Sequence, residues 1–203
     1  TAGAKANGVV FDKLFIRHWD EWADGTKNQL FALDLAPNGA ASNPKPLMTG
    51  FDGDAPSKPF GDETDYAISA DSKSVIFSAR IAGRTEPWST NFDLFRVSAA
   101  GGTGRPENTT EQNKAWDAGP MPAPDGHFMA YRAMKRAGFE ADRFAIMIRE
   151  QDQGGWKDRE LAPAWDRSPD AIAWSADGKM IYATAEDVGQ TRLFAIDVQS
   201  GKV

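Results

Sequence analysis

The residues that could do chemistry in this chain are few, and they do not form a catalytic set. The chain has two His, His18 and His127, and no Cys, which excludes thiolate catalysis and zinc sites with Cys ligands. A Ser nucleophile on a sharp strand-to-helix turn is marked by Gly-x-Ser-x-Gly, and that motif does not occur. Neither His has a second His or Cys at metal-ligand spacing. We therefore expect no catalytic residue, no metal ligand and no cofactor in this chain.

The segment 135–143 is the strongest candidate for ligand binding, because it is long and mixes both signs of charge with Gly and Phe. Glu140 and Asp142 could pair with the free α-amino group of a peptide, and Arg143 lies directly after them. A structural alternative is that Arg143 or Arg136 holds Glu140 in an ordinary salt bridge. Both interpretations stay open at this point.

A second candidate is the segment 18–22, which contains Trp19 and Trp22. The two indole rings offer large flat surfaces, and Asp20 and Glu21 between them could meet a positively charged amino terminus. The segment could therefore line a substrate channel. The alternative is a loop that packs between neighbouring structural units, since aromatic side chains so often serve as core. We expect His18 to be structural or at the surface, like His127.

Acidic residues also gather around Gly53 and Gly61. A calcium site would need several oxygen ligands that converge at short range. The spacing does not match an EF-hand loop, and Pro56 and Pro59 interrupt it. We expect a solvated loop here, formed by Asp52, Asp54, Asp62, Glu63 and Asp65.

The composition is that of a folded globular protein. The chain has 203 residues, of which 41% are hydrophobic and 26% charged. The net charge of −6 argues against nucleic acid and against anionic membrane surfaces as partners. No apolar stretch approaches the roughly 18 residues of a membrane helix. A periplasmic or secreted location is favoured over the cytoplasm, although the lack of Cys does not fix the compartment.

A repeat organises the chain. Three copies of a strand–turn–strand pattern are centred on Asp71, Asp125 and Asp177, which lie 54 and 52 residues apart. The turns read Asp-Ser in the first copy and Asp-Gly in the other two, and Gly tolerates the positive φ that such reversals need. The three Asp are therefore predicted to be turn formers. A period near about 50 residues is typical of β-propeller blades.

A further strand is expected after each turn, because an apolar segment with alternating faces follows it. These segments are 92–97, 144–149 and 193–198, and a related one, 30–35, lies upstream. The fold class is thus all-β, with about four propeller blades of which the first and last are incomplete. The expected blades are residues 10–50, 64–112, 117–162 and 168–203.

Closed propellers generally have about four to eight blades, and an open arc would leave unpaired sheet edges. We therefore expect the chain, residues 1–203, to be a single propeller fragment or to pair with other material. A homodimer is left open as one form of such pairing.

The blade motifs resemble those of known families. Ala123-Pro124-Asp125-Gly126 and Ser175-Ala176-Asp177-Gly178-Lys179 are similar to the Ser-Pro-Asp-Gly-Lys turns of TolB-like, WD-like and peptidase propellers. Four more segments resemble, in this order, the propeller of the prolyl oligopeptidase family. They are residues 15–22, 87–94, 131–143 and 165–168. The resemblance covers nearly the whole chain and points to the bacterial dipeptidyl peptidase and acylaminoacyl peptidase branch.

That resemblance implies a serine peptidase as the parent protein, in which an α/β-hydrolase domain supplies the Ser, Asp and His. This chain lacks that domain, so we expect a non-catalytic portion that gates and anchors peptide substrates for it. The implied partners are a peptide substrate and the hydrolase domain of the same parent. The alternative is a stand-alone TolB-like propeller that acts as a scaffold for protein partners.

Overall fold

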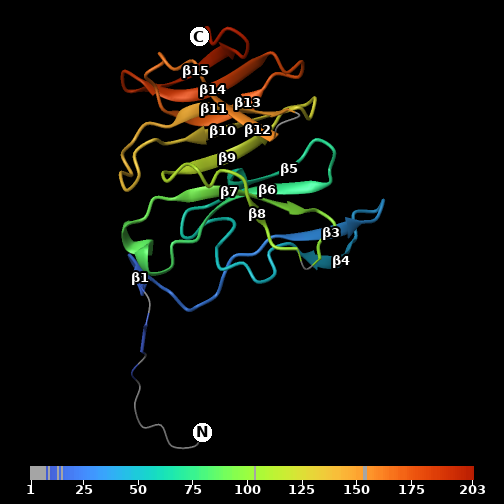
Figure 1. Cartoon of the computed structure of the whole chain (residues 1–203). Coiled ribbons are helices and arrows are strands. Elements are labelled where there is room, and N and C mark those ends of the chain that lie inside the picture. The colour runs from blue at the N-terminus through green and yellow to red at the C-terminus, as the bar shows by residue number, and fades with distance from the viewer. Residues whose placement is uncertain (1–7, 9, 13, 15, 103, 153–154) are drawn as a thin grey trace, which may run out of the picture.

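The molecule is a row of small antiparallel β-sheets stacked face to face (Figure 1). The computed structural model describes residues 8, 10–12, 14, 16–102, 104–152 and 155–203. Within these residues there are 15 strands in five sheets and two short 3₁₀ helices, neither long nor apolar enough to cross a membrane. The described residues therefore confirm the prediction of an all-β fold class.

The first two sheets are hairpins. The strands β1 (Arg17–His18) and β2 (Glu21–Trp22) pair with each other, as do β3 (Phe31–Leu35) and β4 (Ala41–Pro46). The segment 30–35, which was predicted as a strand, forms β3.

The next sheet has the strand order β5-β6-β7-β8. Its strands are β5 (Tyr66–Ile68), β6 (Ser74–Arg80), β7 (Phe92–Ser98) and β8 (Glu107–Asn108). The 3₁₀ helix η1 (Glu63–Asp65) precedes β5, and the 3₁₀ helix η2 (Gly83–Trp88) lies between β6 and β7. A second four-stranded sheet follows, with β9 (Asp117–Pro122), β10 (Phe128–Ala133), β11 (Ala145–Asp152) and β12 (Gly155–Leu161). The last sheet holds β13 (Pro169–Trp174), β14 (Met180–Asp187) and β15 (Gln190–Asp197).

The repeated Asp residues form the tight turns that join the first two strands of each large sheet. In Asp71, Asp125 and Asp177 the carboxylate Oδ1 accepts the backbone N–H two residues later, at 3.0, 2.9 and 3.1 Å. The residue after each Asp has a positive φ: +59° at Ser72 and +74° at Gly126, for example. The turn reading of the repeat is thus confirmed.

The cores lie between successive sheets, so the middle sheets are buried on both faces. In β6, Val75 and Phe77 pack in the core next to the β3–β4 hairpin, whereas Ile76 packs in the next core with Leu94 and Met129. This division follows from the alternation of side chains along a strand. A third core, which includes Ile146, Ile148, Leu161, Ile181 and Ile196, joins the sheets β9–β12 and β13–β15.

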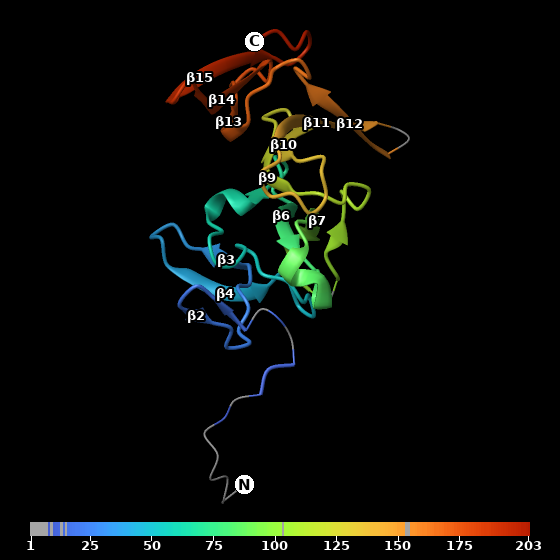
Figure 2. The same ribbon diagram turned by 90° about the vertical axis from the view of Figure 1, so that its left-hand side faces the viewer.

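The inner edge strands of the three large sheets are neighbours, because β9 contacts β5 on one side and β13 on the other. This is the arrangement of blades around a shared axis. The hairpin β3–β4 and the sheet β13–β15 lie at opposite ends of the row, as both views show (Figures 1 and 2).

One ionisable group is buried where β9 begins. Asp117 is 0% exposed, its Oδ1 accepts a 2.7 Å hydrogen bond from Asn113 Nδ2, and its Oδ2 has no partner among the described residues. The Ser78 hydroxyl donates to the Asp117 backbone carbonyl across the sheet interface. Burial raises the pKa of Asp117 to about 7, because the charged carboxylate has lost its hydration.

Candidate functional site

The loop between β10 and β11, residues 134–144, is braced from within by Asp142. Its Oδ2 accepts hydrogen bonds from the backbone N–H groups of Lys135 and Arg136, both at 2.8 Å. Desolvation acts to raise the pKa of Asp142, but the backbone donors outweigh it and hold the pKa below its ordinary value. Asp142 therefore stabilises the closed conformation of the loop, and its Oδ2 is occupied by these hydrogen bonds.

The loop is also tied to its own sheet through Glu160 of β12. Glu160 accepts from Lys135 Nζ at 2.6 Å and from Arg143 Nη2 at 3.0 Å. Arg143 Nη1 further donates to the Trp165 backbone carbonyl at 3.3 Å. Arg143 pairs with Glu160, so the salt bridge from Arg143 to Glu140, one of the two alternatives left open by the sequence, is not formed in the described residues. The guanidinium of Arg136 instead lies over the Phe139 ring, 3.9 Å from its centroid.

The tip of the loop docks onto the neighbouring sheet. The Gly138 backbone N–H donates to Thr90 Oγ1 at 2.8 Å, and Gly138 has a φ of +74° that favours Gly. Thr90 follows η2, whose last residue, Trp88, is 66% exposed. The helix η2, the hairpin β1–β2 and this loop lie at the same end of the sheets, on the left in Figure 1.

Glu140 is the one carboxylate of the loop with no partner in the described part of the chain. It is exposed and takes part in no hydrogen bond or ion pair there. A carboxylate held on a braced loop and free of internal partners can bind an external ammonium group by a charge-assisted hydrogen bond. The arrangement can therefore bind a cation.

Trp19 and Trp22 are surface residues, with exposed fractions of 74% and 62%. Trp19 packs beside His18 and Phe60, at ring-centroid distances of 5.3 and 5.1 Å. Arg17 lies over the Trp22 ring at 5.6 Å. Both rings lie at the surface of the described residues, and whether they line a substrate channel or pack between neighbouring blades stays a prediction. Among the described residues no ring contact or hydrogen bond joins them to the 134–144 loop.

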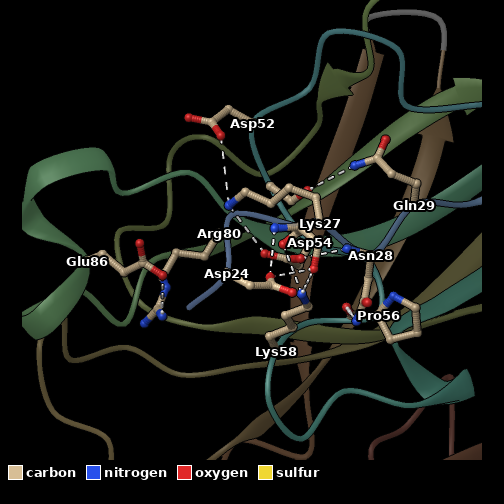
Figure 3. A network of polar contacts seen from close by, with 12 residues as sticks. Asp24, Lys27, Asn28, Gln29, Asp52, Asp54, Pro56, Lys58, Arg80 and Glu86 are labelled. Atoms are coloured by element: carbon tan, nitrogen blue, oxygen red, sulfur yellow. Dashed lines mark hydrogen bonds and ion pairs between the residues drawn. The ribbon is translucent and has the colours of Figure 1, made fainter. Parts of the chain in front are cut away.

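The acidic cluster is tied into a network that fixes the segments before β3 and after β4 (Figure 3). Lys27 Nζ lies 3.8 Å from Asp52 Oδ1 and 3.4 Å from Asp54 Oδ2, and Asp54 Oδ1 accepts the Asn28 backbone N–H at 2.7 Å. Lys58 Nζ donates to the Thr26 carbonyl at 2.9 Å. These carboxylates join two stretches of chain that flank the hairpin.

Asp62 and Asp65 of the cluster are likewise engaged locally. Asp62 caps η1 by accepting the Thr64 backbone N–H at 2.8 Å, and Asp65 accepts from both the N–H and the hydroxyl of Ser57. The described residues contain no group of three or more His, Asp or Glu arranged to hold a metal ion. The cluster is therefore a set of capping and cross-linking groups.

Sequence reasoning missed Glu160 and Thr90, the two side chains that fix the loop in space. Glu160 lies within a strand, and Thr90 follows a 3₁₀ helix. Nothing in their local sequence indicates a partner some 17 to 48 residues away. Only the alternation of β12, which turns Glu160 toward one face, hints at a role.

Comparison with known proteins connects this chain to a family. Dipeptidyl-peptidase 5 of Porphyromonas gingivalis is 30% identical over 200 residues, which are 98% of this chain and 28% of that protein. Dipeptidyl-peptidase 5 of the fungus Trichophyton schoenleinii is 31% identical over 212 residues, which cover 95% of this chain. The chain is a homologue of dipeptidyl-peptidase 5. The predicted relationship to the prolyl oligopeptidase family is thereby confirmed.

The homologues also set limits. The chain spans 28% of the length of these relatives, and both bacterial and fungal proteins are among them, so a bacterial branch is not singled out. No protein-family model matches the chain.

Solved structures agree on the fold. Puromycin hydrolase matches 86% of this chain with a TM-score of 0.59 at 17% identity. A TolB protein of Agrobacterium tumefaciens matches 84% of the chain with a TM-score of 0.56 at 20% identity. These likenesses confirm an all-β fold of TolB-like propeller blades.

Proposed function

We propose that this chain is the propeller portion of a serine dipeptidyl peptidase and that it admits and anchors peptide substrates for an α/β-hydrolase domain of the same parent protein. The carrying observation is the homology to dipeptidyl-peptidase 5 over 98% of the chain. The puromycin hydrolase likeness supports the same architecture. The chemistry belongs to the parent, since the present chain has no Gly-x-Ser-x-Gly motif.

In this proposal Glu140 is the anchor for the substrate. A dipeptidyl peptidase must measure two residues from a free amino terminus, so it needs a negative group at a fixed place. Asp142, Glu160 and Thr90 fix the loop, and Glu140 is left exposed for the ammonium group. Arg143 positions the loop through Glu160, and the exposed rings of Trp19 and Trp22 in the hairpin β1–β2 offer flat surfaces.

The test is the variant Glu140→Gln in the full-length parent protein. A charge-assisted hydrogen bond contributes about 1.5–3 kcal/mol, so KM for a chromogenic dipeptidyl substrate with a free amino terminus should rise by about 10- to 100-fold. The value of kcat should change little, because the reacting bond lies elsewhere. The matched control is Glu150→Gln, which changes an exposed carboxylate of β11.

An unchanged KM in Glu140→Gln would refute the anchoring role. An acylaminoacyl substrate has a blocked amino terminus, so its KM should not change in Glu140→Gln. Its rate of turnover by the parent protein tests whether the parent acts as an acylaminoacyl peptidase. The isolated chain should turn over neither substrate. A parent gene that encodes no Gly-x-Ser-x-Gly domain would refute the peptidase proposal as a whole.

The scaffold alternative has weaker support. It rests on TolB structures that are 20% and 14% identical to this chain, and likeness at that level concerns the fold alone. It accounts for the blades and leaves the braced 134–144 loop without a purpose. A stable protein partner of the parent, together with the absence of a peptidase domain, would favour it.

A further inference from the structure

Three aromatic rings meet at an open corner beside the hairpin β1–β2. The rings of His18, Trp19 and Phe60 lie in mutual contact, with centroid distances of 5.3, 5.1 and 5.5 Å. Trp19 and Phe60 nevertheless remain 74% and 66% exposed. Apolar rings that gather at the surface and still face solvent mark a site of interaction. The rings come from two segments that are distant in sequence, so only the folded chain forms this aromatic corner.

Trp19 is held in a backbone conformation that disfavours a large side chain. It is the first of the two residues in the turn between β1 and β2, and its φ is +48°. Two-residue hairpin turns favour Gly or Asn at such a position, because a Cβ atom crowds the backbone there. Packing in the described residues does not offset this strain, since the indole stays mostly exposed. The turn therefore displays the ring toward solvent at a cost in local stability.

Carboxylates flank the aromatic corner. Asp20 follows Trp19 in the turn, and Glu21 is the cross-strand partner of His18, so the side chains of Glu21 and His18 lie on the same face of the hairpin. Both carboxylates are exposed, and neither takes part in a hydrogen bond or ion pair among the described residues. The exposed rings are thus accompanied by negative charge that has no internal counter-charge.

The basic residues next to the corner in sequence are directed elsewhere. Lys58 Nζ donates to the backbone carbonyl and to the hydroxyl of Thr26, at 2.9 and 3.1 Å. Arg17 alternates with His18 along β1, so its side chain lies on the opposite face of the hairpin, over the Trp22 ring. In the described part of the chain, no arginine or lysine lies over the rings of the corner. The corner therefore suits a cation that comes from outside.

We propose that the aromatic corner binds a basic side chain, lysine or arginine, of the peptide substrate, an inference that rests on the proposed function. The cationic group lies over the exposed faces of Trp19 and Phe60, because the quadrupole of an aromatic ring attracts a cation. It donates a charge-assisted hydrogen bond to the carboxylate of Glu21 or Asp20. The corner thus adds a preference for basic peptides to the anchoring of the amino terminus by Glu140.

Direct binding to the full-length parent protein tests the corner apart from catalysis. The ligands are Nα-acetyl-lysine methylamide and its neutral counterpart Nα-acetyl-norleucine methylamide, and neither has a free amino terminus for Glu140. In calorimetric titrations we expect saturable binding of the lysine compound and about 10-fold weaker binding of the norleucine compound. Trp19→Gly, Phe60→Ala and Glu21→Gln should each weaken binding of the lysine compound by about 3-fold or more. The matched control is Trp88→Ala, which removes an indole that is 66% exposed and has no ring contact among the described residues.

The stability of Trp19→Gly separates a displayed ring from one that packs between blades of the parent. Gly adopts a positive φ without strain, so the thermal midpoint of the variant should equal or exceed that of the wild type. A ring packed between blades would leave a cavity when removed, and the midpoint would fall. Such a fall would overturn the proposal. Equal binding of the lysine and norleucine compounds would do so too, because it would show a purely apolar docking surface.

Two measurements on the parent tell the failure of the corner from the failure of the proposed function. If the parent hydrolyses dipeptidyl substrates and does not bind the lysine compound, the corner alone is refuted. If the parent hydrolyses no dipeptidyl substrate, the proposed function is refuted, and the calorimetric comparison of the lysine and norleucine compounds still decides whether the corner binds a basic side chain.

Discussion

Replacing Asp117 by Asn should raise the free energy of unfolding relative to the wild type, and this difference should grow as the pH rises. Asp117 is fully buried at the start of β9, and burial raises its pKa from 3.8 to about 7. An acid whose folded-state pKa is raised binds its proton more tightly in the folded chain. Its ionisation therefore subtracts stability, beginning near the unfolded pKa and reaching its full extent above the folded pKa. The amide of Asn cannot ionise and escapes this cost.

The size follows from the difference between the two pKa values. Each pKa unit is worth about 1.4 kcal/mol, so full ionisation of Asp117 costs about 4 kcal/mol above pH 7. Roughly a third of this cost is already present near pH 5. The stability of Asp117→Asn relative to the wild type should therefore rise by about 3 kcal/mol between about pH 5 and pH 9.

Urea unfolding followed by circular dichroism at several pH values measures this difference. The matched control is Asp177→Asn, in an exposed turn where the Ser175 hydroxyl holds the pKa of Asp177 below its ordinary value. Because that carboxylate is ionised in both folded and unfolded chains across this pH range, the control should show no change with pH. If Asp117→Asn and the wild type differ by the same amount at every pH, Asp117 does not titrate near neutrality and the reasoning fails.

Three further outcomes are expected. Asp142→Ala should abolish the protection of the Lys135 amide in hydrogen exchange. In the wild type, the same protection should fade as the pH falls through the lowered pKa of Asp142, since protonation weakens the acceptor. Phe77→Ala should lower the free energy of unfolding by about 3–5 kcal/mol in urea titrations, because Phe77 is 0% exposed within the first core. Asp54→Ala should lower it by about 1–2 kcal/mol, because the Asn28 amide loses its acceptor, and an unaltered midpoint would show that water replaces it.

The blades could be predicted because their signals are local. A turn needs only an Asp and a residue that tolerates positive φ, as at Asp125 and Gly126, and a strand needs only an alternating apolar segment. The strand after each turn was found for the same reason. The structure adds that β6 is buried on both faces, which the apolar run from Val75 to Phe77 is consistent with.

The partners of charged side chains could not be predicted in the same way. Arg143 is three residues from Glu140 in sequence, yet it pairs with Glu160, because the pairing of β11 with β12 brings that carboxylate to the base of the loop. Asp117 follows an ordinary Trp at the start of a strand, and its burial arises from the packing of two sheets that the local sequence does not describe. Such contacts depend on how the sheets pack against one another, which the spacing of residues in the sequence does not determine.

The docking of Gly138 on Thr90 has a mechanical consequence. The 134–144 loop is fastened to two separate sheets, to its own through Glu160 and to the preceding one through Thr90. A pull on the loop is therefore shared between two blades, and any ligand that stiffens the loop also resists the sliding of one blade past the other. The hydrogen bond from Gly138 to Thr90 thus ties the position of the loop to the relative placement of the two blades.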